Sequence, residues 1–146
     1  MKRKFMYALV ALVIAGLGAL LVWNYVNKPS KDFVNEKIDF SYSCKDLLEK
    51  TSSDTAAASQ LLNHLVGVDG EVINIMKEAH ALTIELGNSS SNSSVICQID
   101  NRHLNDFKQT KVGDKLSIKG KITACSADDE LGIGSSIQMN FCSINK

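Results

Sequence analysis

The sequence contains little proline, few aromatic residues and no paired-cysteine motif. One proline and nine glycines in 146 residues exclude a collagen-like or low-complexity chain. No two of the four cysteines form a CxxC motif, and the three histidines have no partner at metal-ligand or nucleophile spacing. The sequence therefore predicts no metal or other cofactor and no enzymatic activity.

An excess of basic residues is also missing from the larger part of the chain. Three bases, Lys2, Arg3 and Lys4, lie at the N-terminus, and residues 28–146 contain 13 basic and 16 acidic side chains. The formal net charge of zero thus conceals a charge of −3 on that larger part. A mildly acidic domain is a poor electrostatic partner for the phosphate backbone of nucleic acids.

Residues 5–26 form an apolar run without a charged side chain. A helix of this length spans a hydrocarbon core of about 30 Å. A cleaved signal peptide is the alternative, but its apolar region usually has only about 7–15 residues. The three preceding bases predict a cytoplasmic N-terminus. We therefore expect a basic flank at residues 1–4, a single-pass anchor in the cell membrane at residues 5–26, and a domain that faces the periplasm or the exterior.

A polar linker, residues 27–42, and two short helices follow the apolar run in our interpretation. Ser43 can cap the first helix, which ends at Lys50, as part of a capping box. Ser53 can cap the second helix, which ends at Leu62 and contains three consecutive alanines.

Beyond these helices, the apolar period changes from helical to alternating. Five alternating segments are predicted to be strands: 66–75, 82–86, 95–99, 116–122 and 137–141. The first segment slips in phase after Val72, close to Gly70, which predicts a bulge or sharp bend. Between the third and fourth segments, Asp100 can cap a short helix that carries Leu104 and Phe107.

Three strands, a helix and two further strands, with a bent first strand, is the order of elements in the OB fold, a five-stranded and partly open barrel. We therefore predict a mainly β protein. Its five-stranded OB-type barrel has a helix between strands three and four and is preceded by the two short helices and the N-terminal transmembrane helix. The barrel and its leading short helices form one domain, residues 43–146.

Several short motifs together match the pattern of a known family. They are the apolar N-terminus, residues 37–48, Asp54 with the alanines 56–58, the segment VDGEV at 68–72, Cys97, KVGDKL at 111–116, KGK at 119–121, and Cys142. On these features the chain resembles the tRNA_anti-like family of small membrane-anchored bacterial proteins. The resemblance implies an OB fold similar to the tRNA anticodon-binding domain, and nucleic-acid binding by analogy of fold. Ile122 departs from the pattern, because relatives carry a cysteine there.

OB domains that bind single-stranded nucleic acid use aromatic side chains on their second and third strands together with a basic groove. The second and third predicted strands contain no aromatic residue. The basic candidates for nucleic-acid contacts lie on the outward side of the fourth predicted strand: Lys115, Lys119 and Lys121. The acidic domain favours the other interpretation, a solvated strand face whose lysines discourage edge pairing.

Cys125 and Cys142 lie on opposite arms of the last predicted hairpin and could form a disulfide in an extracytoplasmic domain. They face each other if the turn centres on residues 133–134. They lie several residues out of register if it centres on residues 129–130, which is too far for a bond. The sequence leaves both arrangements open.

These observations favour a non-catalytic, membrane-anchored binding or interaction module of the bacterial envelope. Its expected partner, besides the membrane, is a protein or another envelope component. A single-stranded nucleic-acid-binding OB domain is the alternative.

Overall fold

The computed structural model describes residues 2–27, 31–79, 81–88, 92–128 and 134–145, apart from the side chains of residues 2–6, 8–12, 127 and 128. The chain divides into two compact units, Met1–Lys31 and Asp32–Lys146. Within the described residues, the first unit consists of helix α1, Lys2–Val26. The second unit contains the strands and the short helices.

Helix α1 is apolar, and its side chains are exposed from Val13 to Val26. Leu21 and Trp23, for example, are 72% and 71% accessible. A search of the described residues finds no helix with both the length and the hydropathy to cross a membrane. The helical conformation predicted for residues 5–26 is present. Their role as a transmembrane anchor has no support from the structure and stays a prediction from the sequence.

Two short helices precede the barrel, and a side-chain oxygen caps each of them. In α2, Cys44–Ser53, the Oγ of Ser43 accepts a backbone N–H of the first turn at 3.1 Å, as predicted. In α3, Thr55–Leu61, the cap is the carboxylate of Asp54, which accepts a backbone N–H at 2.8 Å. The prediction that Ser53 caps this helix is wrong. Ser53 ends α2, and its hydroxyl donates to a carbonyl one turn earlier at 2.7 Å.

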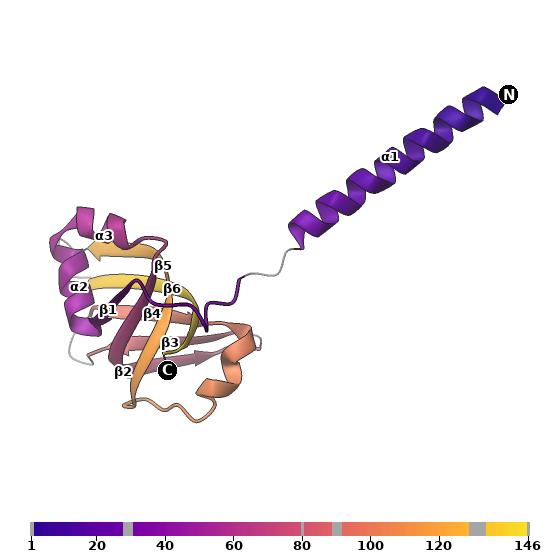
Figure 1. The fold of residues 1–146 in the computed structure, drawn as a ribbon. Coiled ribbons are helices and arrows are strands. Elements are labelled where there is room, and N and C mark those ends of the chain that lie inside the picture. Colours follow the sequence, from indigo (N-terminus) through magenta and orange to yellow (C-terminus); the bar gives the residue numbers. More distant parts are fainter. Residues whose placement is uncertain (1, 28–30, 80, 89–91, 129–133, 146) are drawn as a thin grey trace. The chain divides into compact units, whose positions relative to one another are not determined.

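Five strands close into a barrel, which confirms the predicted OB-type fold (Figure 1). They are β2 (Leu65–Lys77), β3 (Leu82–Gly87), β4 (Ser94–Ile99), β5 (Lys115–Asp128) and β6 (Gly134–Ile144). Their order around the barrel is β2-β3-β4-β6-β5, and β5 also pairs with β2. Neighbouring strands are antiparallel except β4 and β6, which are parallel. The helix between β4 and β5 is η1, a 3₁₀-helix of residues Asn101–Phe107 that Asp100 caps as predicted.

Strand β2 is bent and pairs with two neighbouring strands. Its N-terminal half pairs with β5 and its C-terminal half pairs with β3. A register shift between Val72 and Asn74 marks a bulge at the phase slip seen in the sequence. Gly70 permits close packing beside this bulge. A Cβ there would lie 3.0 Å from the Cβ of Cys44 and 3.1 Å from the Cβ of Leu86.

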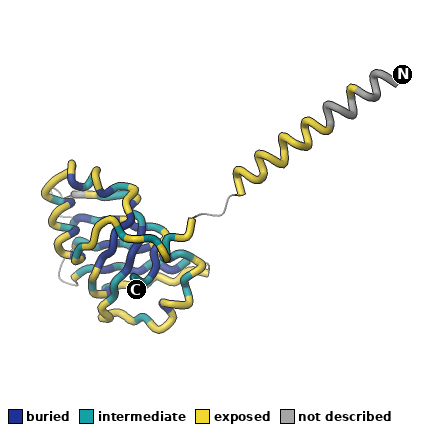
Figure 2. The backbone as a smooth tube through the Cα atoms, in the orientation of Figure 1, coloured by how far each residue is buried: buried dark blue, intermediate teal, exposed yellow. Residues whose placement is uncertain are grey.

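The inward side chains of the five barrel strands form one hydrophobic core. In Figure 2 the buried residues of this unit are dark blue along the backbone of the strands. Leu47 of α2 and Leu61 of α3 belong to this core, as does Phe107 of η1, and all three are at most 3% exposed. In Figure 1, α2 and α3 lie at one end of the barrel, away from η1. Complete burial of each such side chain stabilises the fold by about 1.5–3 kcal/mol.

The second half of the predicted linker is folded onto the barrel. Strand β1, Phe40–Ser43, pairs with β2 in parallel orientation. Residues 32–39, which we call the strap, precede β1. Within the strap, the backbone N–H of Asp39 donates to a β2 carbonyl at 2.8 Å. Ile38 packs over Gly67, and a Cβ added at Gly67 would lie 3.1 Å from the Cδ1 of Ile38. The sequence did not reveal this packing because the few apolar residues of the strap follow no regular period.

Candidate binding surfaces

The OB fold binds ligands on the face of its second and third strands, which are β3 and β4 in this chain. We call the outward side chains here, with those of the adjoining part of β2, the β3–β4 face: Asn74, Met76, Thr83, Glu85, Ile96 and Gln98. None of these six residues is basic or aromatic. Glu85 is the one charged residue among these six, and Met76 is 45% exposed. The face therefore offers aliphatic and neutral polar contacts around a single carboxylate.

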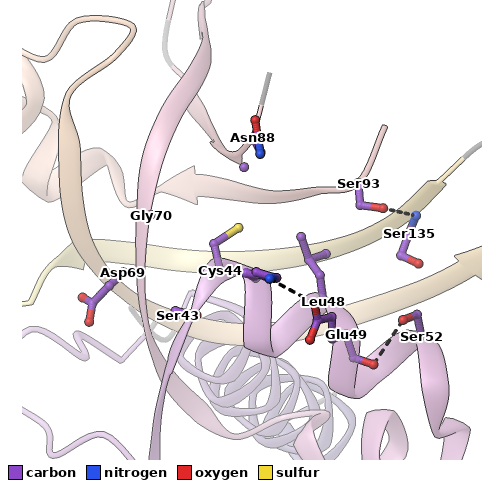
Figure 3. Close-up of a pocket in the computed structure, with 12 residues that line it drawn as sticks. Ser43, Cys44, Leu48, Glu49, Ser52, Asp69, Gly70, Asn88, Ser93 and Ser135 are labelled. Carbon is purple, nitrogen blue, oxygen red and sulfur yellow. Dashed lines mark hydrogen bonds and ion pairs between the residues drawn. The ribbon is translucent and has the colours of Figure 1, made fainter. Parts of the chain in front are cut away.

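A cavity of about 450 Å³, which we call the α2 pocket, opens beside α2 (Figure 3). Its floor includes Gly70 of β2 and Gly87 of β3. The remaining lining comes from α2 and from the adjacent ends of strands: Ser43, Cys44, Lys45, Leu48, Glu49, Ser52, Asp69, Asn88, Ser93 and Ser135. The pocket thus combines an apolar floor with a rim of hydroxyl, amide and charged groups.

Some of the polar groups that line the α2 pocket contact one another. Lys45 Nζ lies 3.7 Å from Glu49 Oε1, and Ser93 Oγ accepts the backbone N–H of Ser135 at 3.0 Å. Burial raises the pKa of the Cys44 thiol to about 11, so this thiol stays protonated at neutral pH and is a weak nucleophile. The pocket can bind a ligand by hydrogen bonds and apolar contact, and its cysteine is not activated for covalent chemistry.

The three lysines predicted as nucleic-acid contacts do not form one solvated surface. Lys115 is exposed and Lys121 is half-buried, whereas Lys119 is only 7% exposed. The Nζ of Lys119 donates to the carbonyl of Glu36 in the strap at 3.3 Å. The interpretation of these lysines as protection against edge pairing also needs correction, because β5 is paired on both sides, with β2 and with β6.

An aromatic cluster lies beside β1, within residues that were predicted to form the linker. The rings of Phe40 and Tyr42 are stacked with centroids 6.3 Å apart, and His64 meets Phe40 edge-on. Lys50 Nζ donates to the Tyr42 hydroxyl at 2.8 Å and lies 4.8 Å from the ring centroid. The alternation Phe-Ser-Tyr-Ser was the available signal for this strand, but four residues are too few to establish a period.

The structure does not bring Cys125 and Cys142 together. Cys125 is paired with Ile137 in the β5–β6 ladder, and Cys142 lies further along β6. All four cysteines are free thiols. Cys142 is fully buried, where burial raises the pKa of its thiol, and its Sγ donates to the carbonyl of Met139 at 3.4 Å. The two turn positions left open by the sequence, residues 129–130 and 133–134, lie outside the described residues except for Gly134, which pairs with Asp128.

Comparison with one solved structure agrees with the barrel topology. A candidate nucleic acid-binding lipoprotein from Klebsiella pneumoniae is similar with a TM-score of 0.59 and 14% identity, over 82% of this chain and 100% of that one. An asparaginyl-tRNA synthetase from Pyrococcus horikoshii is similar with a TM-score of 0.45 and 12% identity. That match covers 75% of this chain and 24% of the synthetase. At such identities the first similarity supports the fold alone.

Comparison with protein families carries more information than these structures. A search of curated proteins gives no match. The tRNA_anti-like family matches residues 1–132, which is most of the chain and includes all the motifs from which the resemblance was inferred except Cys142. No enzymatic family is indicated. The chain therefore belongs to the tRNA_anti-like family of OB-fold domains.

Proposed function

We propose that the barrel is a non-catalytic binding module of the bacterial envelope that recognises a protein or another envelope component. The observation that carries this proposal is the composition of the β3–β4 face. Binding of single-stranded nucleic acid there would need aromatic rings for the bases and cations for the phosphates. The face instead carries Glu85, which repels phosphate, beside Met76 and Ile96, which provide the aliphatic contact common in protein interfaces.

The α2 pocket supports the same proposal. Protein interfaces gain most of their affinity from a few side chains that fill pockets on the partner. An opening of about 450 Å³ with an apolar floor and a hydroxyl rim can hold one such side chain. A partner could therefore combine contact at the β3–β4 face with an anchor in the pocket.

A second candidate function, single-stranded nucleic-acid binding, is favoured by the aromatic cluster beside β1. Stacked rings next to a cation, here Phe40 and Tyr42 with Lys50, are the combination on which unpaired bases stack. The family name and the description of the Klebsiella neighbour point the same way. This candidate would require a binding surface away from the strands that OB domains generally use.

Binding of single-stranded RNA and DNA as a function of salt separates the two candidates. We expect the full chain to bind 20-nucleotide oligomers with a Kd weaker than about 10⁻⁴ M, the weak end of non-specific binding at physiological salt. A micromolar Kd that weakens steeply between 50 and 200 mM salt, and that the double substitution Phe40→Ala and Tyr42→Ala weakens further, would replace the first proposal by the second.

Site-specific crosslinking in intact cells tests the protein-binding proposal directly. A photoreactive residue at position 76 or 96 should capture the same discrete protein, because both positions lie on the β3–β4 face. Val112 provides a matched control, since it is a 62% exposed apolar residue outside that face. The proposal fails if positions 76 and 96 capture nothing, or if position 112 captures the same protein equally well.

We also propose that residues 5–26 tether the module to a membrane. The support is the absence of charge in this run and the three bases before it. The full chain should sediment with membranes, and the double substitution Leu17→Lys and Leu20→Lys should release it. Each lysine near the centre of a spanning helix costs about 2.5–3.5 kcal/mol. An unchanged distribution of the doubly substituted chain would contradict the tether.

A further inference from the structure

Another cavity, which we call the strap cavity, lies between the strap and the ends of β5 and β6 that the strap covers. Its volume is about 770 Å³. Residues 34–38 of the strap form one wall, and the other wall comes from Lys119 of β5, Ile144 of β6 and Asn145 after it. None of these residues belongs to the β3–β4 face or lines the α2 pocket. The strap cavity is therefore separate from the two surfaces on which the proposed function rests.

Contacts at both ends of the strap hold it over this cavity. Oδ1 of Asp32 lies 3.1 Å from Nε2 of His103, which belongs to η1. At the other end, Oδ2 of Asp39 accepts the backbone N–H of Leu65 at 3.0 Å and lies 3.1 Å from Nδ1 of His64. These contacts involve no ligand, so the walls of the cavity are in place before anything binds. A preformed site loses less conformational freedom when it binds a ligand.

Lys119 is the buried charge of the strap cavity. Its side chain lies on the outward side of β5, opposite Gly67 of β2 and Ser143 of β6, and only 7% of it is exposed. An ammonium group has three N–H donors. The carbonyl of Glu36 accepts one of them at 3.3 Å, and no ion pair among the described residues includes Lys119. Because a buried charge is costly unless it is paired, the two other N–H groups favour an anion.

Gly67 leaves room beside Lys119. A Cβ added at Gly67 would lie 3.1 Å from Cδ1 of Ile38 and 3.4 Å from Nδ2 of Asn145, so both side chains reach toward the position that a larger residue would fill. On the same side of the sheet, the buried hydroxyl of Ser143 has no hydrogen-bond partner among the described residues. The surroundings of the ammonium group thus combine aliphatic and neutral polar groups.

The lining of the strap cavity favours a monovalent carboxylate over a phosphate. Lys37 and Lys119 are the basic residues of the described lining and Glu36 is the acidic one, so the formal charge is +1. One positive charge balances a carboxylate, but not the charge of about −1.5 to −2 on a phosphate monoester. Aliphatic side chains complete the lining and can cover the hydrocarbon part of a ligand. They belong to Val34, Ile38 and Ile144.

We propose that the strap cavity binds a small aliphatic carboxylate, which pairs with the Lys119 ammonium group beneath the strap. The carboxylate oxygens accept the two N–H groups that the carbonyl of Glu36 does not accept. Two sources supply this chemistry: a free aliphatic acid, and the C-terminal residue of a protein. The site goes beyond the proposed function and does not depend on it.

Titration of the full chain at pH 7 and constant ionic strength tests the site, with backbone amide shifts of residues 34–38, 119 and 145 as the readout. Sodium 3-methylbutanoate should give saturable shifts with a Kd of about 1–10 mM, which its size permits. The uncharged 3-methylbutanamide should bind at least about tenfold more weakly, because it lacks the charge-assisted hydrogen bonds. Equal affinity for acid and amide would overturn the proposal, as would inorganic phosphate that binds as tightly as the acid.

Two variants show whether Lys119 is the partner of the carboxylate. Lys119→Met removes the charge and keeps an unbranched side chain, so it should weaken the binding of 3-methylbutanoate at least about tenfold. Lys115→Met is the matched control, because Lys115 is an exposed lysine of the same strand that does not line the cavity. Equal losses in the two variants would contradict the site. The comparison of acid with amide uses the unmodified chain, so it decides the question even if Lys119→Met does not fold.

A short peptide with valine at its C-terminus distinguishes the two sources of the carboxylate. If the ligand is a protein C-terminus, this peptide should bind more tightly than 3-methylbutanoate, and amidation of the terminus should remove the gain. Weaker binding of the peptide would assign the site to free aliphatic acids. Crosslinking from positions 76 and 96 does not involve the strap cavity, so failure of this site and failure of the proposed function are distinguishable.

Discussion

At the scale of single residues, the barrel depends on glycines at positions where neighbouring atoms leave no room for a Cβ. Gly120 of β5 is the tightest described case that lacks a positive φ. A Cβ there would lie 2.5 Å from the Sγ of Cys142 and 3.3 Å from the Cε of Met139. The sequence showed a glycine in an alternating strand, which indicates a bulge or a close approach without identifying the partner. The partner is known only because β6 brings Cys142 across β5.

Gly120→Ala should destabilise the domain by about 1–3 kcal/mol, because an added methyl group overpacks a tight core. The double substitution Gly120→Ala and Cys142→Ala removes the sulfur that the methyl group would meet. It should lose less stability than the sum of the two single substitutions. Urea unfolding of the four chains gives this interaction energy. Simple additivity would show that the clash with Cys142 is not the cause.

At the scale of secondary-structure elements, local sequence patterns predicted the strands and helices, but they did not show which other segments pack against each element. The alternating phase of β5 placed its lysines outward, and this placement is correct. Their surroundings differ from the prediction because the strap covers Lys119. The helix caps show the same limit. Serines precede both predicted helices, but only Ser43 acts as a cap, since α2 continues to Ser53 and α3 begins after Asp54.

Alanine substitutions distinguish the two serines. Ser43→Ala should cost about 1 kcal/mol of unfolding free energy, because a backbone N–H of α2 loses its acceptor. Ser53→Ala should change stability by less than about 0.5 kcal/mol, since an exposed hydroxyl at a helix end loses only a local hydrogen bond. Denaturant unfolding under identical conditions provides the comparison. Equal costs would return Ser53 to the role that the sequence suggested.

At the scale of the whole molecule, the folded domain begins earlier than the sequence indicated. The composition of residues 27–42 predicted a linker and placed the domain boundary at residue 43. The structure assigns the strap and β1 to the second unit, which begins at Asp32. The difference arises because β1 and the strap are stabilised by contacts with β2, β5 and η1. None of these contacts leaves a pattern within the segment itself.

Two truncated chains test this boundary. Residues 32–146 should unfold cooperatively, because they contain the complete core. Residues 43–146 lack the β1 ladder and the strap hydrogen bonds, so they should be less stable by more than about 2 kcal/mol, given a net contribution near 1 kcal/mol per buried hydrogen bond. Thermal and denaturant unfolding measure the difference. Equal stability would restore the boundary at residue 43.

The sequence by itself determined the five strands, their order along the chain, the bend of the first strand, and the helix between the third and fourth strands. These features are local, because side chains alternate along a strand and capping residues lie within one turn of a helix. Together they specify an OB-type barrel, and the short motifs identify the family.

Only the tertiary structure decided which outward side chains are exposed to solvent and which are covered by another segment of the chain. It paired Asp32 with His103, 71 residues away, and it buried Lys119 beneath the strap. It also placed Cys125 opposite Ile137 rather than Cys142. Such pairings depend on how the whole barrel closes, and the residues involved follow no period in the sequence. The β3–β4 face became a candidate binding surface only when closure of the barrel had brought these strands together.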